Sequence, residues 1–198
     1  MRATKRSRGQ SLAEFALVVP VLLAMVGGII QFGMIFWAQN TLTQVVRDTG
    51  RWAATQQGCA LGTTVPQVDV AGEANKVAGN SSLLGYTTGE WAQPTSAGST
   101  DASVSSFTGE GIAVAWVQDY DPKTGGSWTH QGCPPKNNQA VYHVTIRINH
   151  AVPLFFPGMQ YLPAFSSCDG TAAVGGVSGP CALLSSTAQF RMEPAPNP

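Results

Sequence analysis

A single carboxylate stands at the start of a long apolar stretch near the N-terminus. Glu14 is followed by no charged residue until Arg47, and most of the side chains between them are aliphatic or aromatic. A charged side chain costs roughly 2.5–3.5 kcal/mol at the centre of a bilayer and less near its interface, and such residues usually have a partner. We therefore expect Glu14 to pair with a cation, with a place among lipid headgroups as the alternative.

Four cysteines are the second group of reactive side chains, and all follow the apolar stretch: Cys59, Cys133, Cys168 and Cys181. An even number of cysteines in an oxidising compartment indicates disulfide bonds, and four cysteines allow three pairings. The pairing we favour joins Cys59 to Cys133 and Cys168 to Cys181. The second bond would close a short glycine-rich loop and contribute about 3 kcal/mol. Structural zinc is disfavoured because no C-x-x-C motif occurs.

Common catalytic and cofactor-binding motifs are missing from the sequence. It has no G-x-S-x-G, no P-loop, no G-x-G-x-x-G after a strand and no H-E-x-x-H. His143 and His150 would point to opposite faces of one strand because they are an odd number of residues apart, which argues against a shared metal. Asp119 and Asp121 could bind a cation, but a solvated turn is the simpler interpretation. We expect no enzymatic activity, no cofactor, no metal and no small-molecule substrate.

The apolar stretch from Phe15 to Ala38 is long enough to cross a bilayer. At ~1.5 Å per residue a helix of this length extends about 36 Å, against a hydrocarbon core of ~30 Å. Four cations precede it: Arg2, Lys5, Arg6 and Arg8. The positive-inside rule therefore places the N-terminus in the cytoplasm and the residues after Asn40 outside. A cleaved secretory signal is the rival interpretation, but the stretch is long and no small-x-small site follows it.

The distribution of charge argues against a nucleic-acid partner. The chain is formally neutral, and residues 1–9 carry four of its eleven cations but none of its eleven acidic residues. Without that segment the protein is acidic, whereas nucleic-acid binding requires clustered Lys and Arg. Only 11% of all residues are charged, which fits an exported domain better than a cytosolic enzyme.

Beyond the apolar stretch the helical pattern continues as an amphipathic helix to about Gln57. Apolar residues recur at spacings of three and four on one face, and the opposite face is polar. The apolar face comprises Leu42, Val45, Val46, Thr49, Trp52 and Ala53, and the polar face comprises Asn40, Gln44, Arg47 and Arg51. Both halves together predict a single helix of roughly 45 residues.

The rest of the sequence predicts a second helix within 65–84, a loop over 85–109 and three strands. The strands are expected at 111–119, 141–149 and 183–192, the first apolar on both faces and the others alternating. In the second strand we expect Tyr142, Val144, Ile146 and Ile148 to face the core and His143, Thr145, Arg147 and Asn149 to face solvent. In the third we expect Leu184, Ser186, Ala188, Phe190 and Met192 to face the core.

The long helix is the available cover for the buried face of this sheet, which predicts an α+β fold. Residues 120–136, which include Cys133, are expected to form a loop. The segment from Ala151 to Phe165 is apolar and contains three prolines, which argue against a regular strand. It would either fold under the sheet or provide a docking surface.

The string RGQSLAEF at 8–15, the following ALVVPVLLAMVGGIIQFG and RWAAT after the helix carry a resemblance to a known family. They resemble the start of TadE-like proteins, the minor pilins or pseudopilins of tight-adherence (Flp-type) pilus systems. Prepilins of this family have Gly before the scissile bond, Glu at the fifth mature position and Phe next to it. These positions fall on Gly9, Glu14 and Phe15, with Gln10 as the first mature residue.

The resemblance implies a pilin-like fold, with a long N-terminal helix, half transmembrane and half amphipathic, packed on a small antiparallel sheet. It implies cleavage of the Gly9–Gln10 bond by a membrane prepilin peptidase at the cytoplasmic face. The new ammonium at Gln10 would pair with Glu14 of an adjacent subunit and set the register between helices. The expected segments are a basic leader at 1–9, a transmembrane segment at 10–38 and an extracytoplasmic domain at 39–198.

These observations lead us to expect a structural minor pilin of the cytoplasmic membrane, joined with other pilins in a helical filament at the cell surface. Pilus assembly, secretion and adhesion are the associated roles. One alternative is an uncleaved single-pass scaffold of an envelope secretion complex, and another is an exported enzyme or binding domain with a membrane anchor. A mature N-terminus at Gln10 would distinguish the pilin from the scaffold, and the third interpretation needs a polar pocket outside the membrane.

Overall fold

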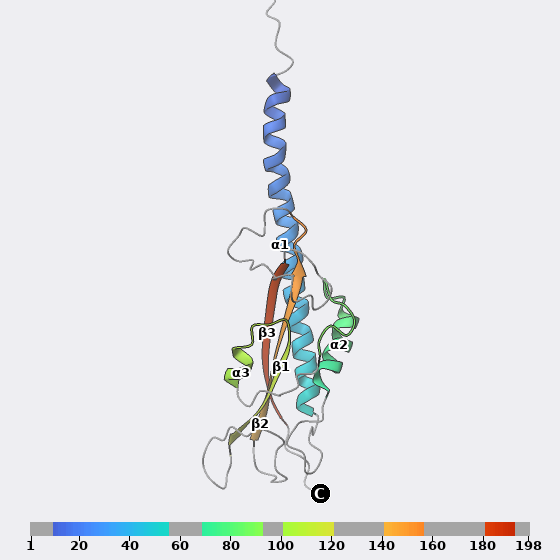
Figure 1. Ribbon diagram of the computed structural model, residues 1–198, viewed down its shortest axis with the longest axis vertical. Coiled ribbons are helices and arrows are strands. Elements are labelled where there is room, and N and C mark those ends of the chain that lie inside the picture. The colour runs from blue at the N-terminus through green and yellow to red at the C-terminus, as the bar shows by residue number, and fades with distance from the viewer. Residues whose placement is uncertain (1–9, 56–68, 93–100, 121–140, 157–180, 193–198) are drawn as a thin grey trace, which may run out of the picture.

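Three helices and three strands make up the parts of the chain that the structure describes (Figure 1). It is a computed structural model that describes residues 10–55, 69–92, 101–120, 141–156 and 181–192. The helices are α1 (Gln10–Thr55), α2 (Val70–Ser81) and α3 (Asp101–Ser105), and the strands are β1 (Gly111–Tyr120), β2 (Val141–Pro153) and β3 (Cys181–Arg191). The predicted α+β fold is confirmed, because α1 packs on a three-stranded antiparallel sheet.

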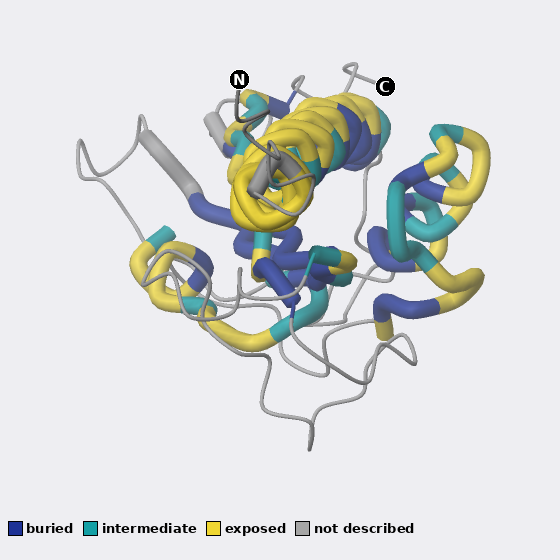
Figure 2. Tube along the Cα trace, turned by 90° about the horizontal axis from the view of Figure 1, so that it is seen from above, coloured by how far each residue is buried: buried dark blue, intermediate teal, exposed yellow. Residues whose placement is uncertain are grey.

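Helix α1 is continuous over 46 residues, close to the predicted length. Its N-terminal half extends away from the sheet, and its C-terminal half lies along the sheet (Figure 1). The predicted apolar and polar faces of the second half are confirmed. The polar face is exposed: Asn40, Gln44, Arg47 and Arg51. On the apolar face Trp52 is half-buried, and the other residues are fully buried: Leu42, Val45, Val46, Thr49 and Ala53. Figure 2, viewed from above, shows this change from an exposed to a partly buried helix.

The sheet has the order β1-β2-β3, with both neighbouring pairs antiparallel. Ile146 of the central strand lies opposite Val114 on one side and Ala188 on the other. The face toward α1 and α2 forms the main core with Leu42, Val45, Val46, Ile112, Val114, Trp116, Val144, Ile146 and Ile148. On β3, Leu184, Ala188 and Phe190 pack against this core, as the alternation predicted.

The other face of β2 is covered, which corrects the prediction that its polar residues face solvent. His143, Thr145 and Asn149 are buried. Thr145 Oγ1 donates to Asp101 of α3 at 2.5 Å, and His143 Nε2 lies 3.0 Å from the same carboxylate. Asn149 Nδ2 donates to two backbone carbonyls in the segment after α3. A polar face can be buried when each group finds a hydrogen-bond partner, which alternation alone does not reveal.

Two other predictions need correction. Residues 101–105 form α3, although 85–109 was predicted to be loop. Strand β2 continues to Pro153, although the prolines argued against a strand there. Among the described residues, β1 pairs no further along β2 than Asn149, whereas β3 pairs with β2 up to Pro153, which lies opposite Cys181. The last residues of β2 therefore have a neighbouring strand on one side only, where proline is tolerated. The predicted loop at 120–136, beyond Tyr120, and residues 157–165 lie outside the described residues.

Candidate functional site

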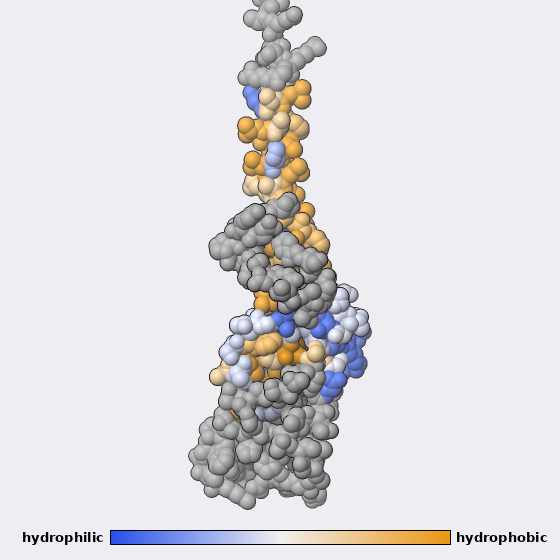
Figure 3. Space-filling model, viewed as in Figure 1, coloured by the Kyte–Doolittle hydropathy of each residue, from blue (hydrophilic) through white to orange (hydrophobic). Residues whose placement is uncertain are grey.

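The N-terminal half of α1 presents apolar side chains to its surroundings (Figure 3). Most side chains along this half are aliphatic or aromatic, and almost none of them is buried. Water-soluble proteins rarely expose continuous apolar surface of this extent. By length and composition this helix could span a membrane, while its orientation and the limit at residue 38 stay predictions.

The predicted cleavage motif lies at the beginning of α1. Gln10 is the first residue of the helix, and the side chains of Glu14 and Phe15 are exposed. Positions four residues apart lie one turn apart on the same side of a helix, so Glu14 follows Gln10 along one face. Gly9 lies outside the described residues. Peptide-bond cleavage and the pairing of Glu14 with a neighbouring subunit therefore stay predictions.

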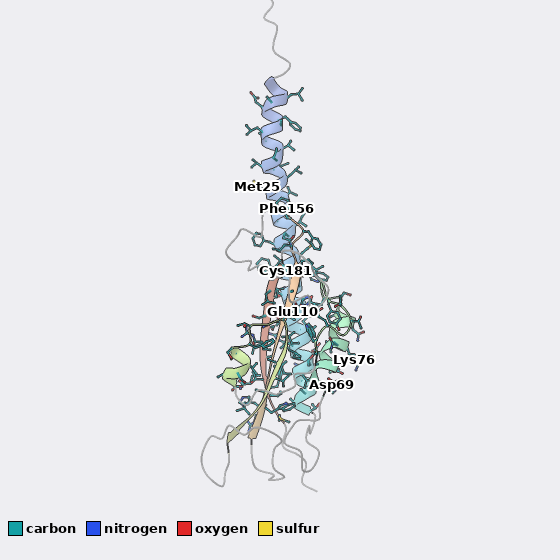
Figure 4. The ribbon with its side chains drawn as sticks, viewed as in Figure 1. Met25, Asp69, Lys76, Glu110, Phe156 and Cys181 are labelled. Atoms are coloured by element: carbon teal, nitrogen blue, oxygen red, sulfur yellow. The ribbon has the colours of Figure 1, made fainter. Side chains whose placement is uncertain are left out.

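Gln31 connects the apolar half of α1 to the end of β2. Its side chain is 1% exposed, although its sequence neighbours are apolar. Oε1 of Gln31 accepts hydrogen bonds from the backbone N–H of Phe155 at 2.8 Å and of Phe156 at 3.3 Å, and Nε2 lies 3.5 Å from the carbonyl oxygen of Pro153. Figure 4 shows Phe156 beside α1, where its ring covers Gly27 so closely that a Cβ there would overlap it.

The buried Glu90 and His150 and the half-buried Glu110 form a cluster a few residues before the end of β2. His150 Nδ1 is 2.6 Å from Glu90 Oε1, and His150 Nε2 is 2.9 Å from the carbonyl oxygen of Leu84. Both ring nitrogens thus face acceptors, an arrangement satisfied by a protonated imidazole beside a carboxylate. Glu90 Oε2 accepts from the backbone N–H of Thr87 at 3.0 Å, which closes the turn that carries this carboxylate.

The cluster shifts the protonation of two of its members. Burial raises the pKa of Glu110 to about 7, and the neighbouring Glu90 adds to this shift. Burial by itself lowers the pKa of His150, but the hydrogen bond and negative charge of Glu90 outweigh it, so the pKa of His150 is raised. The backbone N–H of Ala151 donates to Glu110 Oε1 at 3.3 Å, which places this carboxyl group beside β2.

The cluster could in principle hold a metal, because one ligand atom from each residue lies within 4.8 Å of the others. The separation of 2.6 Å between His150 and Glu90 is that of a charge-assisted hydrogen bond, so a shared proton already accounts for the geometry. Because the side chains of Glu90 and His150 are fully buried, the pair is also poorly placed to reach a substrate. We interpret the cluster as an anchor of the 84–90 segment on β2.

Most of α1 also matches a known protein family. Residues 9–51 match the family model described as TadE-like protein. The N-terminal helix is TadE-like. The match confirms, for residues 9–51, the resemblance drawn from the cleavage motif and the apolar run. Comparison with curated proteins and with solved structures finds no match.

The TadE-like match ends within α1, so the sheet lies beyond it. Cys181, at the start of β3, is the one predicted disulfide cysteine that falls within the described residues (Figure 4). It is buried, lies opposite Pro153 and is not a free thiol. Cys59, Cys133 and Cys168 lie outside the described residues, so the pairing stays a prediction.

Sequence reasoning did not identify Gln31 or the cluster at His150 as structural sites. For Gln31 a signal was present, because it is the only amide side chain between Phe15 and Ala38. A buried amide within an apolar run needs a polar partner, and the end of β2 provides one. For Glu90 and Glu110 the local sequence held no comparable signal, since both belong to segments rich in Gly, Ser and Thr.

Proposed function

We propose that this chain is a minor pilin or pseudopilin-like structural component of a tight-adherence (Flp-type) pilus assembly and secretion system. The observation that carries the proposal is the extent of the TadE-like match, which begins at Gly9 and covers the exposed apolar helix. The proposed partners are a prepilin peptidase, other pilins of a helical filament and the cytoplasmic membrane. The N-terminus would lie in the cytoplasm and the sheet outside, with adhesion as an associated role.

The proposed maturation step would create a cation with which Glu14 can pair between subunits. Hydrolysis of the Gly9–Gln10 bond by the peptidase would remove the four leading cations and leave an ammonium group on Gln10. Glu14 of an adjacent subunit would then pair with this ammonium. In a water-poor environment an unpaired charge is unfavourable, so the pair would select one register between neighbouring helices. The exposed apolar side chains of α1 would pack against the same helices of neighbouring subunits.

Mass measurement of the protein from its host tests the cleavage. We expect intact mass and N-terminal sequencing of assembled protein to give Gln10 as the first residue. The variant Gly9→Leu is the matched control, because a bulky side chain before the scissile bond should leave residues 1–9 attached. Assembled wild-type protein that keeps Met1–Gly9 would contradict the proposal and favour the uncleaved scaffold.

Substitution of Glu14 tests the pairing. We expect Glu14→Ala and Glu14→Gln to abolish or strongly reduce incorporation into filaments while membrane insertion is retained. Leu17→Ala is the control, because Leu17 is also exposed on α1 but carries no charge. Pilus assembly at the wild-type level in Glu14→Gln would show that the carboxylate does not set the register.

We further propose that the exported part carries two disulfide bonds, Cys59–Cys133 and Cys168–Cys181. All four cysteines follow the apolar helix and would lie in an oxidising compartment. Cys181 sits at the edge of the sheet close to the end of β2. A bond there would tie the segment before β3 to the membrane-proximal end of the domain.

A further inference from the structure

We propose that residues 153–156, at and just after the end of β2, lie in the outer interface of the bilayer, where lipid covers the exposed aromatic side chain of Phe155. This extends the proposed function and depends on its membrane-spanning helix. We call the four aromatic residues at this level the aromatic collar: Phe32, Phe36, Trp37 and Phe155. Through the collar the external domain would contact the membrane surface directly.

The length of α1 places this level at the outer boundary. A hydrocarbon core of ~30 Å is crossed by about 20 helical residues. If the inner boundary is at Leu12, the outer boundary is at Gln31. If it is at Phe15, Gln31 lies about 5 Å inside the outer boundary. In both cases the backbone of Phe155 and Phe156, hydrogen-bonded to Gln31, lies at the depth of the interface.

The hydrogen bonds at this level suit a place with little water. Irregular backbone at membrane depth is tolerated only when its polar groups are satisfied by protein. The buried Gln31 amide does this, because its single oxygen accepts from two successive backbone N–H groups just after the strand ends. In water these groups would have ready partners, so a buried glutamine within an apolar run would be unnecessary.

Several exposed side chains at this level are aromatic, beside the exposed aliphatic Ile29 and Ile30. Phe155 is 63% exposed, Phe36 67% and Trp37 49%. Trp is enriched where membrane spans meet the headgroup region, and Phe is favourable in the hydrocarbon next to it. The backbone that carries Phe155 is held in place, since Leu154 and Phe156 pack with Ile35 of α1 and Ala182 of β3. Phe155 is thus an exposed aromatic side chain on a backbone that is held against α1.

Photocrosslinking of the full-length chain tests this proposal. The photoreactive analogue p-benzoylphenylalanine is incorporated at Phe155, and the chain is placed in vesicles of phosphatidylethanolamine and phosphatidylglycerol. The same analogue at Phe15 reports the lipid-facing helix. Phe107, half-buried beside β1, reports the body of the external domain. A second probe at Phe36 samples the collar from α1 itself, in case the substitution at Phe155 disturbs the fold.

We expect lipid adducts, identified by mass spectrometry, at Phe15, Phe36 and Phe155 in comparable yield. We expect no lipid adducts at Phe107. Adducts at Phe15 without adducts at Phe155 would contradict the proposal that residues 153–156 lie in the membrane interface. The same result would still support a membrane-spanning helix. Absence of lipid adducts from Phe15 would instead contradict the membrane-spanning helix. Crosslinks from Phe155 to a second copy of the chain, without lipid adducts, would identify the collar as a subunit interface and overturn the proposal.

Discussion

His150 Nδ1 lies 2.6 Å from Glu90 Oε1, and both side chains are fully buried. The two residues are 60 positions apart in the chain, so their hydrogen bond joins the segment before β1 to the middle of the sheet. A buried pair of this kind is costly to break, because the remaining partner would be left charged without compensation. The half-buried Glu110 makes the stability of this junction depend on pH.

Stability of the external domain should decrease as the pH rises from about 4.5 through about 7. The folded pKa of Glu110 lies above its usual value of 4.5, so the folded state keeps a proton that the unfolded chain releases over this interval. The stabilisation from this proton is complete below the unfolded pKa and is lost as the pH rises through the folded pKa. His150 acts in the same direction, because its pKa is also raised above 6.5. Thermal unfolding in detergent at a series of pH values measures the effect.

The variant Glu110→Gln tests whether Glu110 causes this pH dependence of stability, because glutamine resembles the protonated carboxyl group at every pH. We expect the variant to unfold at a higher temperature than wild type at about pH 8 and at a similar temperature at about pH 5. Glu73→Gln is the matched control, since among the described residues Glu73 forms an ion pair with the exposed Lys76 on α2. If Glu110→Gln shows the wild-type slope of Tm against pH, another group is responsible.

Gln31→Leu should destabilise the junction between α1 and β2. The substitution removes the acceptor of the Phe155 and Phe156 N–H groups, and leaving such buried donors unsatisfied costs about 1–3 kcal/mol. Gln39→Leu is the control, because Gln39 makes one exposed hydrogen bond, to the backbone of Ser185. Denaturant unfolding in detergent compares the two variants. Equal losses of unfolding free energy would show that Gln31 has no special role.

Gly50→Ala should weaken the packing of α1 on β3. A Cβ at Gly50 would overlap the ring of Phe190, and forcing extra atoms into a packed contact costs about 1–3 kcal/mol. Alanine is the better helix former, which offsets about 1 kcal/mol of this loss. Gly28→Ala is the control, because within the described residues no atom beyond the neighbouring helix backbone lies within 4 Å of a Cβ placed there. Measured in the same detergent, Tm should be lower for Gly50→Ala than for Gly28→Ala. A higher Tm for Gly50→Ala than for Gly28→Ala would contradict the packing.

Mass spectrometry without reduction tests the two disulfide bonds. We expect no free thiols in exported protein and two crosslinked peptides, one joining Cys59 to Cys133 and one joining Cys168 to Cys181. The reduced sample is the control and should alkylate at all four cysteines. Four alkylated cysteines in the unreduced protein would exclude the bonds, and different crosslinked peptides would correct the pairing.

Patterns with a strong local period predicted much of this fold. The spacing of Leu42, Val45 and Val46 identified the buried face of α1, and the alternation along β3 identified its core-facing residues. Helix α3 carries no such period, because it has only five residues in a segment rich in Ser and Thr. Its Asp101 binds His143 and Thr145 of β2, and these contacts are absent until the sheet has formed.

The sequence by itself determined the long apolar helix, the TadE-like motif at its start and the strand periods, since each depends on residues that are close in the chain. Only the tertiary structure decided that Glu90 meets His150 and that Gln31 accepts the N–H of Phe155, 124 residues away. Side-chain types and local spacing do not encode such partners. They meet because burial of the apolar face of the sheet against α1 removes these polar groups from water at the same place. A buried polar group is unfavourable unless it forms a hydrogen bond, so they bond to each other.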